Sequence, residues 1–198
     1  MTSSADFQTL VERAMQAGGR ANMRPVIEKE LLHYNILFAL DQDDLLDQLT
    51  FQGGTSLRLC YGAPRFSEDL NFAGGRDFAT TQLLSMKSCL EGYIGKRYGF
   101  EVTVKEPKET AADRKHEHIR VDKWQIRVVT SPQRRDLPKQ MIKIEVANIP
   151  AYSRVPQSLK QNYDFCPPKS FMARTSWIRC HDSFRWTCRR ERSGKKNF

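Results

Sequence analysis

The sequence predicts a mixed fold of helices and strands, of the α+β or α/β class, and we expect the α+β arrangement. A long segment, residues 26–40, has helical spacing, and three later segments alternate between apolar and polar residues. The expected order is helix, strand, helix, strand, helix and then three strands. The 198 residues, of which 39% are hydrophobic, are sufficient for one globular domain with a core.

The expected helices begin near the N-terminus. Residues 7–15 predict a short helix, and residues 26–40 predict a longer one with a broad buried face and Pro25 in its first turn. A further helix is expected over residues 55–60, directly after two glycines. Residues 78–98 have helical spacing and predict the last helix.

The expected strands divide into two groups. The first two are short and each is closed by a pair of glycines, whereas the last three alternate as half-buried strands do. A charged loop and a proline-bounded turn separate the alternating segments. The five expected strands are residues 49–51, 69–72, 100–105, 119–130 and 140–146.

We divide the chain into an N-terminal helix and loop (1–22), a core (23–165) and a basic tail (166–198). Periodicity ends near the start of the tail, which is interpreted either as a disordered native extension or as the product of a reading-frame shift. A net charge of +9 favours nucleic-acid partners in general. However, residues 172–198 hold eight Lys/Arg and two Asp/Glu, so +6 belongs to the tail and only +3 to the rest.

The composition disfavours several classes of protein. No run approaches the roughly 18 consecutive apolar residues of a membrane span, and the first residues lack the pattern of a secretory signal. The five cysteines are odd in number and form no C-x-x-C pair, which disfavours a disulfide framework or a zinc site. We therefore expect a cytoplasmic protein that does not contact a membrane.

Some conspicuous residues are expected to have no part in chemistry. His116 and His118 lie in the charged loop without further ligands at metal-binding spacing. Cys60 is expected to be a small core residue. Arg134 and Arg135 are expected to be solvated, with contact to RNA phosphates as the alternative.

Gly53, Gly54 and Thr55 are the first candidates for binding. Two glycines between a strand and a helix let backbone N–H groups converge on an anion such as a phosphate. Thr55 adds a hydroxyl donor at the start of the helix. The alternative is a turn with no ligand.

Asp69, Asn71 and Glu145 are the candidates for a metal site. Asp69 and Asn71 are two residues apart on an expected strand, so their side chains point to the same face. Oxygen ligands placed in this way can hold Mg²⁺ against the phosphates of a nucleotide. Glu145 lies inside another apolar strand and is a candidate third ligand. The exposed face of an edge strand would also accommodate it.

Residues 51–72, FQGGTSLRLCYGAPRFSEDLNF, carry a long resemblance to a known family. The segment is similar to the AbiEii toxin family of the nucleotidyltransferase superfamily, whose pattern is F-x-GGT-x-L-R-L-x-Y followed by R-[FY]-SEDLDF. The resemblance covers roughly residues 23 to 165. The matching residues are Phe51, Gly53, Gly54, Thr55, Leu57, Arg58, Leu59, Tyr61, Arg65, Phe66, Ser67, Glu68, Asp69 and Leu70.

The resemblance implies a nucleotidyltransferase-like mixed sheet flanked by helices. It also implies a Mg²⁺-dependent transfer of a nucleotide from a nucleoside triphosphate to an acceptor, which we expect to be tRNA or another RNA. Members act as toxins of type IV toxin–antitoxin and abortive-infection systems, paired with a winged-helix antitoxin. In this reading Arg65 and Ser67 line the nucleotide cleft. Arg65 would contact phosphate or pair with Glu68 or Asp69, and Arg58 is equally well explained as a structural ion-pair partner.

Two departures from the family pattern leave open whether the chain is an enzyme. The second Asp of the family is Asn71 here, which removes one negative charge from the metal site. The helical C-terminal part of the family, with its A-D-K-like and R-D-x-x-D-L-like motifs, has no counterpart after residue 165. The alternative hypothesis is therefore a truncated, inactive remnant that at most binds nucleotide or a partner protein.

Overall fold

We describe the fold from a computed structural model. The described residues are 4–16, 19–107, 119–133, 139–160, 162–163 and, for the backbone alone, 172–175. His116, His118, Arg134 and Arg135 lie outside this range.

The described part of the chain forms helices around one seven-stranded sheet with the strand order β3-β4-β5-β2-β1-β7-β6. Strand β2 is parallel to β5 and antiparallel to β1, so the sheet is mixed, as expected. In chain order the elements are α1 (Ser4–Gln16), α2 (Arg24–Gln42), β1 (Thr50–Gln52), α3 (Gly53–Tyr61), β2 (Leu70–Ala73), η1 (Thr80–Leu83), α4 (Met86–Tyr98), β3 (Glu101–Lys105), β4 (Val121–Val129), β5 (Gln140–Ala147), β6 (Val155–Ser158) and β7 (Met172–Thr175).

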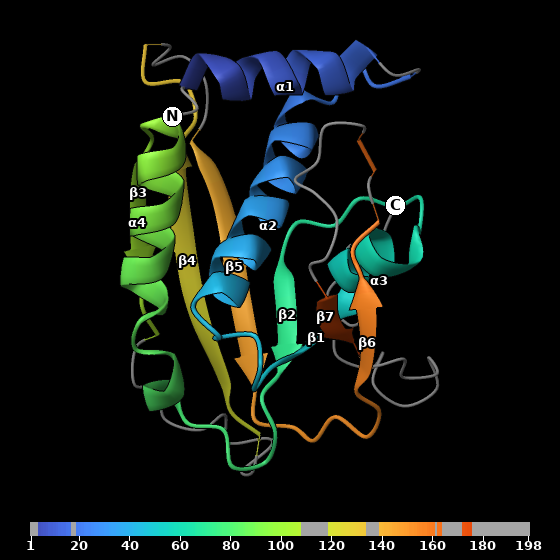
Figure 1. The fold of residues 1–198 in the computed structure, drawn as a ribbon, viewed down its shortest axis with the longest axis vertical. Coiled ribbons are helices and arrows are strands. Elements are labelled where there is room, and N and C mark those ends of the chain that lie inside the picture. The colour runs from blue at the N-terminus through green and yellow to red at the C-terminus, as the bar shows by residue number, and fades with distance from the viewer. Residues whose placement is uncertain are drawn as a thin grey trace, which may run out of the picture.

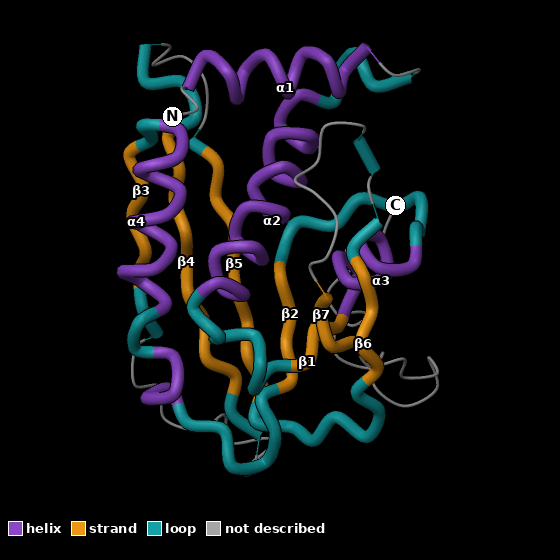
Figure 2. The backbone as a smooth tube through the Cα atoms, viewed as in Figure 1, coloured by secondary structure: helices purple, strands orange, loops and turns teal. Residues whose placement is uncertain are grey.

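Helix α2 lies against the middle of the sheet, between α4 and α3, while α1 crosses one end (Figure 1). Figure 2 shows β4 and β5 behind α4 and α2, whereas β6 passes in front of α3. Because α2 has neighbours on several sides, polar residues of this helix are buried as well as apolar ones. Its side chains Ile27, Leu32, Ile36 and Leu37 are fully buried and form the centre of the core.

The long strands bury one face and leave the other more open. On β4 and β5, residues such as Trp124, Ile126 and Ile144 are buried in the core with the helices. The alternate residues, including Lys123 and Lys143, lie on the opposite face. Pairing of β4 with β5 over eight residues keeps this alternation in register. The apolar periodicity of the sequence therefore determines which face packs and which face is available for chemistry.

The segment expected to be one helix over residues 78–98 is interrupted. Phe78 is buried in a loop, where its ring lies against Gly74 so closely that a Cβ there would be 2.5 Å from it. The Thr80 hydroxyl donates a hydrogen bond to Asp122 Oδ2 at 2.5 Å, which fixes the short helix η1 to strand β4. The α-helix begins only at Met86. Tertiary contacts thus override the helical spacing of residues 78–85.

Strands β6 and β7 were not expected from the sequence. Strand β7 pairs in parallel with β1 and antiparallel with β6, so four residues of the segment interpreted as a tail extend the sheet. Val155–Ser158 contains a proline and has no clear alternation, which is typical of a strand at a sheet edge.

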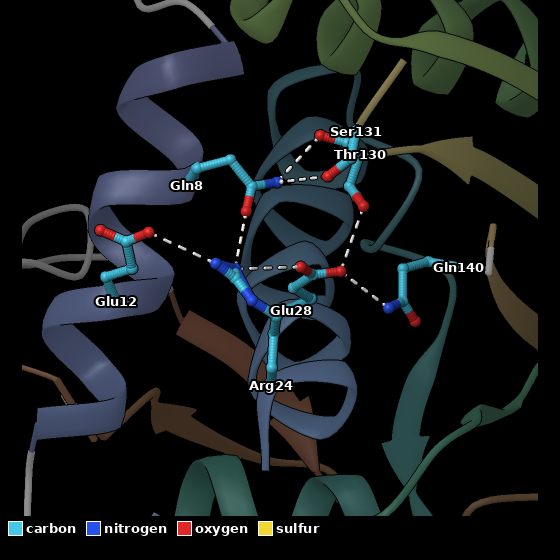
Figure 3. Close-up of polar contacts among 7 residues, drawn as sticks. All are labelled: Gln8, Glu12, Arg24, Glu28, Thr130, Ser131 and Gln140. Atoms are coloured by element: carbon cyan, nitrogen blue, oxygen red, sulfur yellow. Dashed lines mark hydrogen bonds and ion pairs between the residues drawn. The ribbon is translucent and has the colours of Figure 1, made fainter. Parts of the chain in front are cut away.

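A buried carboxylate joins the two N-terminal helices to the sheet (Figure 3). Glu28 Oε2 accepts hydrogen bonds from Thr130 Oγ1 at 3.1 Å and from Gln140 Nε2 at 2.8 Å. Arg24 lies 3.7 Å from the other oxygen of Glu28 and donates to Gln8 of α1. These hydrogen bonds and the nearby guanidinium offset the free energy that burial of the Glu28 carboxylate costs. The network fixes the end of the sheet that α1 crosses.

Candidate active site

Four polar side chains form a row across the more open face of the sheet. Asn71 of β2 is paired with Glu145 of β5 on one side and with Gln52 of β1 on the other. Glu145 is in turn paired with Lys123 of β4. Adjacent strands lie about 4.8 Å apart, so neighbouring members of the row are close enough to share a small cation or a phosphate.

Asp69 lies one residue before β2, beside this row. Its side chain is 36% exposed, and its Oδ2 lies 3.9 Å from Nζ of Lys143. Partial burial raises the pKa of Asp69, and the neighbouring charge of Glu145 raises it further, although Lys143 lowers it. The register of β2 with β5 pairs Leu70 with Ile144, so Asp69 lies beside Lys143 and diagonally across from Glu145. The structure therefore brings together all three residues expected to bind metal.

The two glycines at the start of α3 lie in close contact with side chains of the candidate site. A Cβ on Gly53 would lie 3.0 Å from the side-chain nitrogen of Asn71, and one on Gly54 would lie 2.9 Å from Oγ of Ser67. Gly53 also has a φ of +81°, which an L side chain rarely adopts. Helix α3 begins at Gly53 rather than at Thr55, so both glycines belong to its first turn. The N–H groups in the first turn of a helix have no partner within the helix, and this turn lies beside Asn71 and Ser67.

Thr55 lies in the first turn of α3. Its side chain is buried, and its hydroxyl donates a 2.6 Å hydrogen bond to the backbone carbonyl of Asp69. The hydroxyl therefore connects the glycine turn to the segment that carries the candidate metal ligand. Contact with phosphate by the Thr55 hydroxyl remains a prediction that this geometry does not test.

Arg65 and Ser67 lie in the loop before Asp69. Ser67 is half-buried and packs against Gly54, beside the first turn of α3. Arg65 is exposed, and among the described residues no ion pair joins it to Glu68 or Asp69. Glu68 pairs instead with Lys29 of α2, at 2.7 Å. Neither Glu68 nor Asp69 therefore holds the Arg65 side chain in place within the described part of the chain.

Sequence reasoning overlooked His33 of α2. This residue is buried, and its Nε2 lies 3.0 Å from the backbone carbonyl of Glu68. Burial is the main cause that lowers its pKa from 6.5 to about 4, so the neutral ring donates to that carbonyl at neutral pH. Lys29 and His33 are four residues apart on one helix and both contact Glu68. Residues four apart lie on the same side of a helix, so the spacing of Lys29 and His33 could have indicated from the sequence that they share a partner.

Arg58 is structural. Its guanidinium pairs with the buried carboxylate of Glu30 on α2, donates to the carbonyls of Ala63 and Pro64, and lies 3.6 Å from the centre of the Phe66 ring. All three nitrogen atoms of the guanidinium thereby donate to protein oxygen atoms. Cys60 is buried, as expected, and burial raises the pKa of its thiol to about 12, so it is not a nucleophile at neutral pH.

The donor set is compatible with one hard divalent cation. Mg²⁺ in proteins is commonly held by one or two carboxylates and the phosphates of a substrate, with water completing its shell. Asp69 and Glu145 supply two carboxylates, and Asn71, the β2 partner of Glu145, carries an amide that could offer its oxygen. In the part of the chain that the structure describes, no three His, Cys, Asp or Glu side chains group to hold a metal. A cation at these residues would therefore need further ligands, such as water or the oxygens of a bound nucleotide.

A mixed sheet with helices on one face, a glycine turn at a helix start and carboxylates on adjacent strands defines a nucleotidyltransferase-type domain. The family model described as "Nucleotidyl transferase AbiEii toxin, Type IV TA system" matches residues 35–175, which is more than half of the chain. The chain therefore belongs to the AbiEii family of nucleotidyltransferase toxins. No helix within the described residues has the length and apolar character needed to cross a membrane.

Two solved structures from Helicobacter pylori are similar to this chain. One, a candidate nucleotidyltransferase, is 22% identical with a TM-score of 0.44 over 76% of this chain and 55% of its own. The other, JHP933, is 22% identical with a TM-score of 0.38 over 67% of this chain and 53% of its own. The chain thus spans about half the length of each. The search of curated proteins gave no match.

Proposed function

We propose that the chain carries the nucleotide-handling site of a Mg²⁺-dependent nucleotidyltransferase, which transfers a nucleotide from a nucleoside triphosphate to an RNA acceptor such as tRNA. The pairing of Asn71 with Glu145 on parallel strands, with Asp69 beside them, is the observation that supports this most strongly. Carboxylates on adjacent strands are suited to bind the cation that accompanies a triphosphate.

In the proposed reaction an acceptor hydroxyl attacks the α-phosphorus, a new P–O bond forms, and the bond to pyrophosphate breaks. The hydroxyl loses its proton to a site carboxylate or to water, and pyrophosphate leaves. The backbone N–H groups at Gly53 and Gly54 would bind phosphate oxygens, with Ser67 and Arg65 at the same edge. A bound Mg²⁺ would supply charge neutralisation at the phosphates.

The family membership supports a biological setting for this activity. We propose that the chain acts in the cytoplasm as the toxin of a type IV toxin–antitoxin or abortive-infection system. Its partner would be an antitoxin of the winged-helix type, encoded by a neighbouring gene. Co-expression of the two followed by a growth assay would test this setting.

A second candidate function is binding of nucleotide or of a partner protein without transfer. Asn71 favours it, because an amide in place of a carboxylate weakens the hold on a divalent cation. In that case the fold would be retained while the chemistry would be absent.

Incubation of the protein with labelled nucleoside triphosphates, Mg²⁺ and total tRNA tests the transfer. We expect label to enter RNA, and we expect Asp69→Ala to reduce incorporation by about 100-fold or more. Arg127→Ala, which removes an exposed charge from β4, is the matched control and should retain activity. Absence of incorporation by the natural chain, together with activity of Asn71→Asp, would favour the second candidate.

A further inference from the structure

Each carboxylate of the candidate site already has a cation beside it. Nζ of Lys143 lies 3.9 Å from Asp69, and Nζ of Lys123 lies 3.0 Å from Oε1 of Glu145. The two lysine side chains are 44% and 58% exposed, so neither ammonium is buried in the core. Sequence reasoning had assigned no role to either lysine.

The strands themselves determine the positions of these lysines. Lys123 is the direct partner of Glu145 in the β4–β5 pairing. Lys143 precedes Glu145 by two residues on β5, so both point to the same face. Strand pairing, rather than a loop, therefore places two positive charges where a divalent cation would be held.

We propose that Lys123 and Lys143 occupy the cation positions of this site before substrate arrives and bind the triphosphate once the metal–nucleotide has entered. This inference rests on the proposed function. A lysine ammonium is a compact charge on a flexible stem, which allows it to leave a carboxylate and reach a phosphate a few ångströms away. Mg²⁺ and an ammonium within 4 Å compete for the same oxygen atoms.

The proposal requires opposite effects on two affinities. Removing either lysine should strengthen binding of the free metal, because a competing charge is lost. The same change should weaken binding of the nucleotide, because a phosphate contact is lost. A purely structural role would weaken both, and a role limited to general surface charge would be shared by other lysines and arginines on this face.

The test measures Mn²⁺ binding by electron paramagnetic resonance without nucleotide, and then binding of the four non-hydrolysable α,β-methylene triphosphates. Lys123→Met and Lys143→Met retain most of the stem and remove the charge. We expect Mn²⁺ affinity to rise by about three- to tenfold and nucleotide affinity to fall by a similar factor. Arg127→Met is the control, since Arg127 is exposed on the same strand face and four residues, roughly 13 Å, from Lys123.

Several outcomes would decide between the possibilities. Unchanged or weaker Mn²⁺ binding in both lysine variants, with normal binding by the natural chain, would overturn this proposal and leave the proposed function intact. Mn²⁺ binding by the natural chain that Asp69→Asn does not reduce would overturn both. Lys123→Arg and Lys143→Arg keep the charge and should bind Mn²⁺ as the natural chain does. A rise in affinity in these arginine variants would also contradict the proposal.

Discussion

The hydroxyl of Thr55 donates a 2.6 Å hydrogen bond to the backbone carbonyl of Asp69. Thr55 belongs to the first turn of α3, whereas Asp69 lies at the entrance to β2, fourteen residues later. One partly buried contact thus connects the glycine turn, where phosphate would bind, to the backbone of the residue whose carboxylate would hold the metal. The two halves of the candidate site are therefore not independent.

We expect Thr55→Val to destabilise the fold by about 1–3 kcal/mol, because it leaves the Asp69 carbonyl without its donor. Valine keeps the shape of threonine, so little packing is lost. Thr55→Ser retains the hydroxyl and should preserve Mn²⁺ affinity, whereas Thr55→Val should lower it. Urea unfolding and metal titration of the two variants measure this. Equal metal affinities in Thr55→Val and the natural chain would show that the hydrogen bond does not position Asp69.

Gly54→Ala should weaken nucleotide binding and stability, because its Cβ would lie 2.9 Å from Oγ of Ser67. Addition of Ser67→Gly removes the clashing atom and should restore the stability lost, so the pair should show strong coupling in a double-mutant cycle.

The matched comparison is Gly53→Ala with Asn71→Gly. Removing the Asn71 side chain relieves the contact at 3.0 Å but not the left-handed backbone of Gly53, at a φ of +81°. A cost of about 1–2 kcal/mol should therefore persist. If Asn71→Gly restored the whole stability lost in Gly53→Ala, the positive φ of Gly53 would not contribute to the cost of that substitution.

Asn71→Asp should increase affinity for Mn²⁺ on the order of tenfold, since a third carboxylate faces the bound ion. Without metal, the same change places a third negative charge near Asp69 and Glu145 and should lower Tm. Differential scanning calorimetry with and without Mg²⁺ measures both effects in one experiment. If Mg²⁺ raises the Tm of the natural chain and of Asn71→Asp equally, the side chain at position 71 does not contact the metal.

Stability should fall as pH decreases from about 6.5 to about 4 because of His33. Burial lowers the pKa of His33 to about 4, so in this range the unfolded chain binds a proton that the folded chain does not. Such a difference in pKa corresponds to about 3 kcal/mol. His33→Gln can still donate to the Glu68 carbonyl and does not titrate. Urea unfolding at a series of pH values should show a flatter profile for this variant, and an unchanged profile would refute the assignment.

Arg58→Met should destabilise the fold by about 3–5 kcal/mol, because the carboxylate of Glu30 would remain buried without its partner. Arg58→Met with Glu30→Gln removes the uncompensated charge and should recover part of the loss. Recovery of stability in the double variant would identify Arg58 as the ion-pair partner of Glu30. If Arg58 bound substrate instead, nucleotide affinity would fall in both the single and the double variant. Thermal unfolding and nucleotide titration test this.

Most elements of the core could be predicted from local patterns. The helix around residues 24–42 and the alternating strands β3, β4 and β5 follow from spacing alone, because burial on one side imposes a period. Strands β6 and β7 could not be predicted, because their pairing joins segments distant in sequence and neither alternates clearly. The interruption of residues 78–98 has a similar cause: Phe78 and Thr80 are held by Gly74 and Asp122.

The sequence by itself singled out Gly53, Gly54, Asp69, Asn71 and Glu145 as candidates, since their residue types and spacing suit phosphate and metal. It also predicted that Asp69 and Asn71 point the same way. Only the tertiary structure decided that Asn71 is paired with Glu145, that Lys123 and Lys143 lie beside the carboxylates, and that the Thr55 hydroxyl is directed to the backbone. The physical reason is that side-chain direction is a local property of a strand, whereas register between strands depends on how distant segments pack together.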